Sequence, residues 1–356
     1  MKFKLASVAL CLTLAACSGG NPFEDDDDSG TGDDGTTDGG TGITRDGVPP
    51  GTESPSAGTG LFRSEIPTDG GNGFARGISY DGDSDTFTVD NLAFDGANTY
   101  QRGRAVGSLG GGEFAVYEAD AQYPDSITGA AVNQFTHRAI YGVSRNRDSD
   151  GDPTTQFAIV RTGAYIPYGF GGFIYQRGGS VDLPTTGQAI FRGQAGGLRD
   201  FDGAGALQYS TGDVAIAIDF DDFNESTGGR GDGVQGQLTN RQVFDINGND
   251  ITANVTTRIN DLNSSSIQSI PAAIFTVAPG VLDNNGDLVG ELTSRFVNDN
   301  GDVVEYESGN YYAIVSGDDP DEIVGVMVLE NTSEFRDATV RDTSGFIVYR
   351  DPNVQP

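Results

Sequence analysis

The stretch GNYYAIVSGDDPDEIVGVMVLE, residues 309–330, contains two apolar runs separated by a short acidic segment. Gly317 and Gly325 bracket that acidic segment, and glycine tolerates the positive φ angles that tight turns require. Another apolar run, TSGFIVYR, follows at residues 343–350. We therefore expect a strand, a tight acidic turn and further strands at this end of the chain.

From about residue 60 onward, apolar residues recur at every second position, which is typical of strands with one buried face. The pattern is visible in DTFTVDNLAF at 85–94, in DVAIAIDFDDF at 213–223 and in ITANVTTRI at 251–259. Turn signals of the hairpin type separate such segments at Asp81-Gly82, Asn247-Gly248, Asn285-Gly286 and Asn300-Gly301. We interpret all three segments as strands and find no convincing amphipathic helix longer than a few turns.

About eight alternating runs lie between Gln188 and Tyr349, enough for side chains to fill a small barrel. A closed barrel also leaves no exposed sheet edge. The sequence therefore predicts an all-β chain. An eight-stranded antiparallel barrel occupies residues 185–350, a smaller β-rich, handle-like subdomain occupies 61–184, and residues 351–356 form a tail.

The motifs of the C-terminal half resemble those of the β-barrel domains of transferrin-binding protein B. The resemblance lies in the order of Gly309-Asn310-Tyr311-Tyr312, Gly317, Glu322 and Gly325, and in the segments TTGQAIFRGQAGG (185–197), AIAIDFDD (215–222) and GVQGQLTNRQVF (233–244). It covers roughly residues 185–350, and the region before it resembles the family's handle sheet less clearly. The resemblance implies a surface lipoprotein, one lobe in size, that takes part in iron acquisition.

The N-terminus carries an export signal. MKFK supplies two lysines, and a short apolar run follows that is less than the roughly 20 residues of a membrane span. Leu14-Ala15-Ala16-Cys17 resembles a bacterial lipobox, so we expect a signal peptide at 1–16 and acyl chains on Cys17. Several acyl chains hold a protein to a bilayer where a single one does so only marginally. The alternative is an ordinary signal peptide, and Ser18 after the cysteine points to the outer membrane.

Residues 17–60 contain mainly Gly, Asp, Thr, Ser and Pro, which cannot bury enough surface to fold. We expect a disordered acidic tether, whose roughly 40 residues would reach about 35 Å from the anchor. The net charge is −31, and it becomes −33 when Lys2 and Lys4 leave with the signal. Such a charge repels nucleic acid and favours cationic partners or high salt. With Cys11 removed and Cys17 acylated, disulfides and thiolate metal sites are excluded.

The aromatic stretch VRTGAYIPYGFGGFIYQR, residues 160–177, is a candidate recognition surface. Tyr165, Tyr168 and Phe170 are the ligand-binding candidates in it. The alternative, which we favour, is that the glycines let the chain bend while the aromatic side chains fill the junction between two sheets.

Other motifs give weaker indications. Asp148, Asp150 and Asp152 match the start of a calcium loop, but Pro153 and Ile159 break the pattern, so we expect a hairpin loop. The RGD tripeptide at 230–232 lies in a Gly-rich loop and is interpreted as a chance match. His137 is the only histidine and lies in a strand-like run, where a structural role is commoner than a catalytic one.

No Gly-x-Ser-x-Gly elbow occurs, so we predict that the chain is not an enzyme and holds no metal or cofactor. The leading hypothesis is an outer-membrane lipoprotein acting as a surface binding module for an unknown protein or solute. The alternatives are a structural lipoprotein that faces the periplasm and a carbohydrate-active enzyme.

Overall fold

A computed structural model of the 356-residue chain describes residues 48–352 with gaps, and the statements below concern these residues. The gaps lie at 69–72, 74–75, 91–96, 120–121, 125–127, 134–136, 164–167, 169–170, 232 and 279. Cys17, Tyr165 and Phe170 fall outside the described residues.

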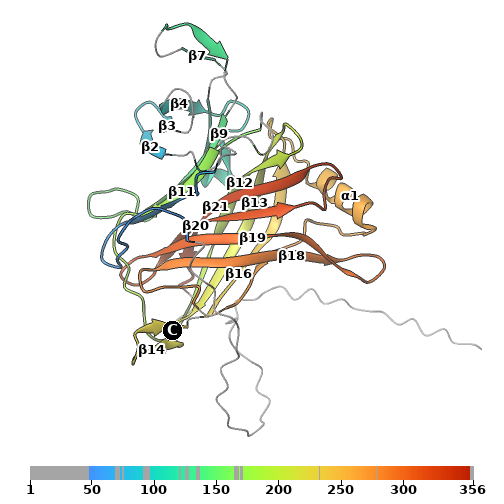
Figure 1. Cartoon of the computed structure of the whole chain (residues 1–356). Helices are drawn as coiled ribbons and strands as arrows, with labels where there is room; N and C mark the ends of the chain where they lie inside the picture. Colours follow the sequence, from blue (N-terminus) through green and yellow to red (C-terminus); the bar gives the residue numbers. More distant parts are fainter. Residues whose placement is uncertain are drawn as a thin grey trace, which may run out of the picture. The chain divides into compact units, whose positions relative to one another are not determined.

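The C-terminal half forms a closed antiparallel barrel of eight strands (Figure 1). Its strands are β12 (Gln188–Asp202), β13 (Leu207–Asp219), β16 (Gly233–Phe244), β17 (Ala273–Phe275), β18 (Asp287–Val297), β19 (Val303–Ser316), β20 (Glu322–Asn331) and β21 (Thr339–Arg350). Pairing of β12 with β21 closes the ring. The predicted all-β class and eight-stranded barrel are confirmed.

Alternation of side chains builds the barrel interior. In β13, Val214, Ile216 and Ile218 belong to the buried apolar cluster that fills the barrel. Gly317 has a φ of 107° in the turn after β19, as expected. Gly325 instead lies within β20, where an added Cβ would meet Phe346 Cζ at 2.6 Å, so the expectation that it flanks the turn was wrong. Its lack of a side chain serves close packing.

A second, curled sheet of nine strands precedes the barrel. Its strand order is β1 (Leu61–Ser64), β11 (Gly171–Arg177), β10 (Thr155–Thr162), β9 (His137–Val143), β6 (Phe114–Glu118), β4 (Ala97–Arg102), β3 (Thr86–Asp90) and β2 (Arg76–Asp81), with β5 (Ser108–Leu109) paired to β6. We call it the small sheet. All its pairs are antiparallel, and the region is β-rich, as predicted.

The inner face of the small sheet packs on the outside of the barrel. One buried apolar cluster contains Ile159 and Phe173 from the small sheet together with Leu198 and Ile347 from the barrel. Gly345 of β21 makes room for this contact, since a Cβ there would lie 2.1 Å from the ring of Phe157. The two sheets therefore share one core.

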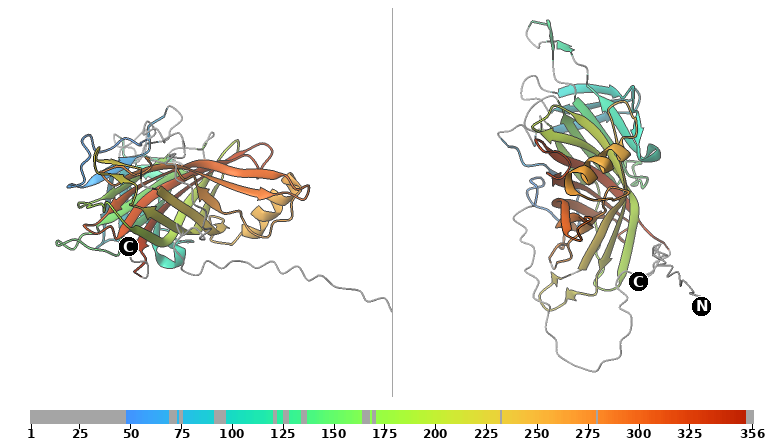
Figure 2. Two further views of the ribbon diagram at one scale, coloured as in Figure 1. Left: turned by 90° about the horizontal axis from the view of Figure 1, so that it is seen from below. Right: turned by 90° about the vertical axis from the view of Figure 1, so that its right-hand side faces the viewer.

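The segment predicted as a strand at 251–259 is helical. Helix α1 spans Thr252–Asn263 and lies with the β18–β19 hairpin at one end of the barrel (Figures 1 and 2). Val255 and Ile259 are buried against a small apolar cluster that includes Phe296. The prediction was wrong because a spacing of four residues satisfies both a strand and a helix. No helix of the described residues is long and apolar enough to cross a membrane.

Short elements complete the fold. They are the one-turn 3₁₀ helix η2 (Gly110–Gly112) and the two-stranded ribbons β7 (Gln122–Pro124) with β8 (Ala131–Asn133) and β14 (Phe223–Asn224) with β15 (Gly229–Arg230). Residues before β1 are hydrogen bonded to the body, because Ser64 donates to the carbonyl of Pro50 and Val181 to that of Ala57. The predicted domain boundaries stay predictions.

Candidate functional site

The outer face of the small sheet, which points away from the barrel, presents aromatic and amide side chains in neighbouring rows. Strand pairing places Phe62 beside Gln176 and Gln176 beside Gln156. The next row along the strands contains Tyr141 and Ile174. Because side chains alternate along a strand, these residues face away from the junction cluster. We call this face the aromatic hollow.

Two adjoining cavities occupy the aromatic hollow. The smaller has a volume of about 280 Å³ and is lined by Phe62, Tyr141, Gln156, Phe157, Ala158, Ile174 and Gln176. The larger, of about 750 Å³, shares Tyr141, Gln156 and Gln176 with it and extends to Tyr80 and Arg102. Strand pairing places Ala158 between Tyr141 and Ile174. Because the alanine side chain is small, it leaves space between these two larger side chains, and this space forms the floor of the smaller cavity.

Packed rings hold the exposed aromatic residues of the hollow. Tyr80 is 43% exposed and Phe62 is 42% exposed. The Tyr80 ring lies 5.6 Å from that of Tyr141 and 6.3 Å from that of Tyr117, measured between centroids. Phe87 supports them from the core, with its centroid 5.4 Å from that of Tyr141. The exposed ring of Tyr80 is thus held in position by its aromatic neighbours, while Phe62 lines the smaller cavity.

Hydrogen bonds fix the polar groups of the hollow. The Tyr141 hydroxyl donates to Gln156 Oε1 at 2.6 Å, and burial raises the pKa of Tyr141 to about 12. Asp85 accepts hydrogen bonds from Arg102 and from the hydroxyl of Tyr117, and the bond from Arg102 lowers the pKa of Asp85. Tyr141 is therefore a neutral phenol at physiological pH, and the charges of Asp85 and Arg102 offset each other.

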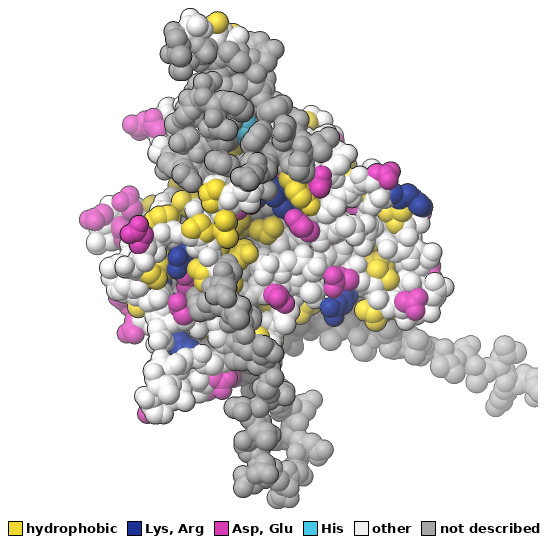
Figure 3. All heavy atoms as spheres, viewed as in Figure 1, with side chains coloured by type: hydrophobic (Ala, Val, Ile, Leu, Met, Phe, Trp, Pro, Cys, Tyr) yellow, Lys and Arg dark blue, Asp and Glu magenta, His cyan; other side chains and the backbone are white. Residues whose placement is uncertain are grey.

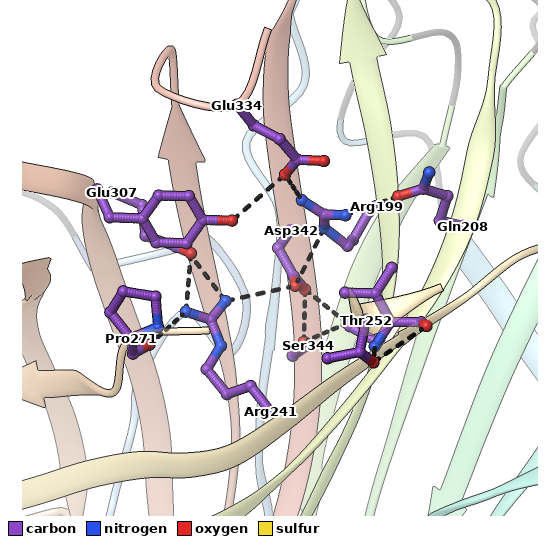
Figure 4. A network of polar contacts seen from close by, with 12 residues as sticks. Arg199, Gln208, Arg241, Thr252, Pro271, Glu307, Glu334, Asp342 and Ser344 are labelled. Carbon is purple, nitrogen blue, oxygen red and sulfur yellow. Dashed lines mark hydrogen bonds and ion pairs between the residues drawn. The ribbon is translucent and has the colours of Figure 1, made fainter. Parts of the chain in front are cut away.

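A buried network of charged residues lies at the end of the barrel near α1 (Figure 4). Arg241 contacts Glu307 at 2.8 Å and Asp342 at 3.8 Å. Arg199 pairs with Glu334, to which Arg258 of α1 also donates at 2.6 Å. The figure shows the guanidinium groups of Arg199 and Arg241 pointing at carboxylates from other segments, namely Glu307 of β19, Asp342 of β21 and Glu334 between β20 and β21.

The pKa values in this network follow from burial and pairing. Burial raises the pKa of Glu307 despite the neighbouring Arg241. Burial acts in the same sense on Glu334, but Arg199 and Arg258 outweigh it and lower its pKa. Charges satisfied in this way connect the helix to the barrel and do not form an acid–base pair open to a substrate.

A polar groove of about 910 Å³ borders the network. It runs between the Gly110–Gly112 turn and the barrel, where Asn240, Gln242 and Thr252 line it. Among the described residues, no group of three or more His, Cys, Asp or Glu side chains could hold a metal ion. Phe244 is the one aromatic residue among those that line the groove, whereas Phe62, Tyr80, Tyr117 and Tyr141 line the aromatic hollow.

Of the three aromatic candidates from sequence, only Tyr168 is described. It is half-buried with a φ of 52°, and the Arg341 guanidinium lies 4.3 Å from its ring centroid. Phe173 and Tyr175, from the same stretch, are buried in the junction between the sheets, as the packing interpretation predicts. The stretch therefore supplies core to the junction, and whether its candidates bind a ligand stays a prediction.

The remaining sequence motifs have structural surroundings. Asp148 accepts backbone hydrogen bonds from Asp150 and Asp152 within the predicted hairpin loop. His137 is buried in β9. Arg230 of the RGD tripeptide donates to the carbonyls of Leu183 and Pro184, which ties it to the body.

Sequence reasoning missed Phe62, Tyr80 and Tyr141. Each belongs to a segment of alternating pattern, but their meeting depends on the order of strands in the small sheet. An exposed aromatic residue in an otherwise polar strand position, such as Tyr80 before the Asp81-Gly82 turn, was the available signal.

No protein-family model and no curated protein sequence matches the chain. Among solved structures, the chain is similar to a double mutant of transferrin binding protein B from Haemophilus parasuis Hp5, with 11% identity and a TM-score of 0.38 over 82% of this chain and 45% of that one. Isotype 1 transferrin binding protein B from serogroup B Neisseria meningitidis shows 11% identity and a TM-score of 0.32 over 82% and 51% of the two chains.

A further similar structure is HpuA from Kingella denitrificans, solved in complex with human haemoglobin. It shares 8% identity with the chain at a TM-score of 0.24, over 68% of this chain and 87% of that one. The chain spans about half the length of the two transferrin binding proteins.

Proposed function

We propose that the chain is a non-enzymatic lipoprotein of the outer membrane, anchored through Cys17, that presents the aromatic hollow as a binding surface for a protein or solute. The observation that carries the proposal is the exposure of Phe62 and Tyr80 on a supported concave face. Tyr is among the residues that supply most binding energy at interfaces. The buried acids and arginines of the barrel are paired with one another, which favours binding over catalysis.

The anchor can be tested because the mature chain would contain no lysine. Lys2 and Lys4 are the only lysines, and both lie in the predicted signal peptide. Lipoproteins of this type carry diacylglycerol on the cysteine thiol and a third acyl chain on the new amino terminus, so the mature protein would have neither a primary amine nor a free thiol. We expect an amine-reactive dye and a maleimide to leave the native protein unlabelled.

The matched control is Cys17→Ala, which blocks processing and retains Lys2 and Lys4. This variant should take up the amine dye at Lys2, Lys4 and its free N-terminus, and without acyl chains it should be absent from the outer-membrane fraction. Native protein that labels with maleimide would show that Cys17 is not acylated and would remove the anchor from the proposal.

The position of the body is tested by protease treatment of intact cells. Release or digestion of the folded body would support display at the cell surface, and full protection until the outer membrane is opened would favour the periplasm-facing structural lipoprotein. The sequence resemblance implies an iron-carrier ligand, so iron-loaded and iron-free transferrin are the first protein probes. Retention that is lost in a Phe62→Ala, Tyr80→Ala double variant would support the hollow as the binding surface.

A further inference from the structure

We propose that the aromatic hollow binds an uncharged carbohydrate. This inference rests on the proposed function and names the ligand class of the same surface. It is carried by three features of the hollow, which are exposed aromatic faces, paired amide side chains and the lack of charge in its smaller cavity.

The aromatic features fit a sugar ring. A pyranose has an apolar face of C–H groups that packs on the face of an aromatic ring. Phe62 and Tyr80 each expose more than two fifths of their surface at the edge of the hollow. Small-molecule sites combine such apolar walls with a few placed polar groups.

The amide features fit hydroxyl groups. A sugar hydroxyl both donates and accepts hydrogen bonds, and so does a glutamine side chain. Gln156 and Gln176 lie directly opposite each other on neighbouring strands. The hydroxyl of Tyr141 already donates to Gln156 Oε1 at 2.6 Å, which holds this amide in place with two N–H donors for a ligand.

The charge distribution favours an uncharged ligand. Of the described residues that line the smaller cavity, none is a carboxylate, an arginine or a histidine. In the larger cavity Arg102 is paired with Asp85 at 2.7 Å. A chain of net charge −31 repels anionic sugars. The smaller cavity has no acid to attract a cationic group, whereas Glu113, Arg147, Asp148 and Asp152 also line the larger one, so the sugar ring is placed in the smaller cavity.

The test uses the folded, purified protein on an array of uncharged, sialylated and sulfated oligosaccharides, followed by calorimetric titration of each hit. We expect binding of uncharged sugars only, with an affinity that is unchanged between about 0.05 M and about 0.5 M salt. Phe62→Ala, Tyr80→Ala and Gln156→Ala should each weaken binding about tenfold or more. Val303→Ala is the matched control, because Val303 is 70% exposed at the β18–β19 hairpin, outside the hollow.

Each variant is first checked by near-ultraviolet circular dichroism and thermal unfolding. Binding of charged sugars alone, binding of no sugar, or hits that the hollow variants leave unchanged would each overturn the carbohydrate inference. If a peptide or protein probe binds instead and the same variants abolish that binding, the hollow still works as a binding surface and only its ligand class is wrong. The two failures are thereby distinguished.

Discussion

The carboxylate of Glu322, at the start of barrel strand β20, accepts hydrogen bonds from the hydroxyls of Ser144 and Thr154, which lie just after β9 and just before β10 of the small sheet. Asn146 donates to the same carboxylate at 3.2 Å. Glu322 is buried, and Ser144, Asn146 and Thr154 are neutral. The glutamate that lies between Gly317 and Gly325 in the sequence thus connects the barrel to the loop between β9 and β10.

Replacing Glu322 by alanine should destabilise the protein by about 1–3 kcal/mol, because the buried hydroxyl of Ser144 and the half-buried donors of Asn146 and Thr154 lose their acceptor. Urea unfolding followed by circular dichroism measures the change. Glu305→Ala is the matched control, since the Glu305 pair with Arg295 is exposed and should contribute less than about 1 kcal/mol. Equal effects of the two substitutions would contradict the assigned role of Glu322.

The same residue predicts a pH dependence. Burial raises the pKa of Glu322 above 4.5, so its folded-state pKa exceeds that of the unfolded chain. The stabilisation of the folded state that comes from protonated Glu322 is fully present below about pH 4.5, and it is lost as pH rises through the raised pKa. The free energy of unfolding of the wild-type protein should therefore contain a component that decreases as pH rises above about 4.5. This component should be absent in Glu322→Gln, because glutamine cannot ionise. Parallel curves of stability against pH for the two proteins would rule this out.

Arg177 holds five carbonyl oxygens with one guanidinium group. Its partners are the carbonyls of Ser56, Thr59, Gly179, Asn285 and Val315. Burial lowers the pKa of Arg177 to about 10, so it stays charged at neutral pH. Lysine has three donors in place of five, and we expect Arg177→Lys to cost about 2–4 kcal/mol.

Thermal and urea unfolding measure the effect of Arg177→Lys. Arg192→Lys provides the control, because Arg192 is 44% exposed and lies 3.4 Å from Asp351. This conservative change should be nearly neutral. A similarly small effect at Arg177 would mean that its carbonyl contacts do not hold the segment before β1.

Strand pattern and barrel size could be predicted from the sequence because alternation is a local property of each strand. The helix at Thr252–Asn263 could not, since Ile251, Val255 and Ile259 recur at intervals of four, which fits both periods. Contacts with distant parts of the chain favour the helix over a strand, because Val255 and Ile259 are buried against Phe296 and Tyr306 of the β18–β19 hairpin.

The aromatic hollow was likewise beyond prediction from sequence. Phe62, Gln156 and Gln176 lie far apart in the chain, and they become neighbours only because β1 pairs with β11 and β11 with β10. No local pattern encodes this order of strands. The motif glutamate shows the same limit, because the sequence marks Glu322 but not its partners in the small sheet.

The junction between the sheets predicts a specific coupling. A Cβ on Gly345 would lie 2.1 Å from the ring of Phe157, so Gly345→Ala should cost about 1–3 kcal/mol through overpacking. In a Phe157→Leu background the smaller side chain should relieve part of that cost, giving a coupling energy of at least about 0.5 kcal/mol. A double-mutant cycle by urea unfolding measures it.

Gly236 supplies the control for this cycle. A Cβ on Gly236 would meet Phe275 at 2.5 Å inside the barrel, so Gly236→Ala should carry its own penalty. Phe157→Leu should leave that penalty unchanged, because the two sites share no partner. Additive effects of Gly345→Ala and Phe157→Leu would show that the sheets do not pack as described.

The charge distribution predicts that salt stabilises the fold. Five arginines pair with acids at sites where their side chains are less than one tenth exposed, namely Arg63, Arg161, Arg199, Arg241 and Arg341. The chain has 52 acidic and 21 basic residues, and acidic side chains outnumber basic ones on the face shown in Figure 3. Salt screens exposed charges strongly and buried pairs much less, so added salt should relieve surface repulsion while leaving the buried pairs intact.

We expect the melting temperature to rise from low to physiological ionic strength, by the same amount in sodium and potassium chloride. Sucrose at matched osmolarity is the control, because it does not screen charge but acts by exclusion from the protein surface. A rise that differs between the two chlorides would indicate specific ion binding. A fall in melting temperature with salt would mean that exposed ion pairs, such as Arg102 with Asp85, outweigh the repulsion among the acidic side chains.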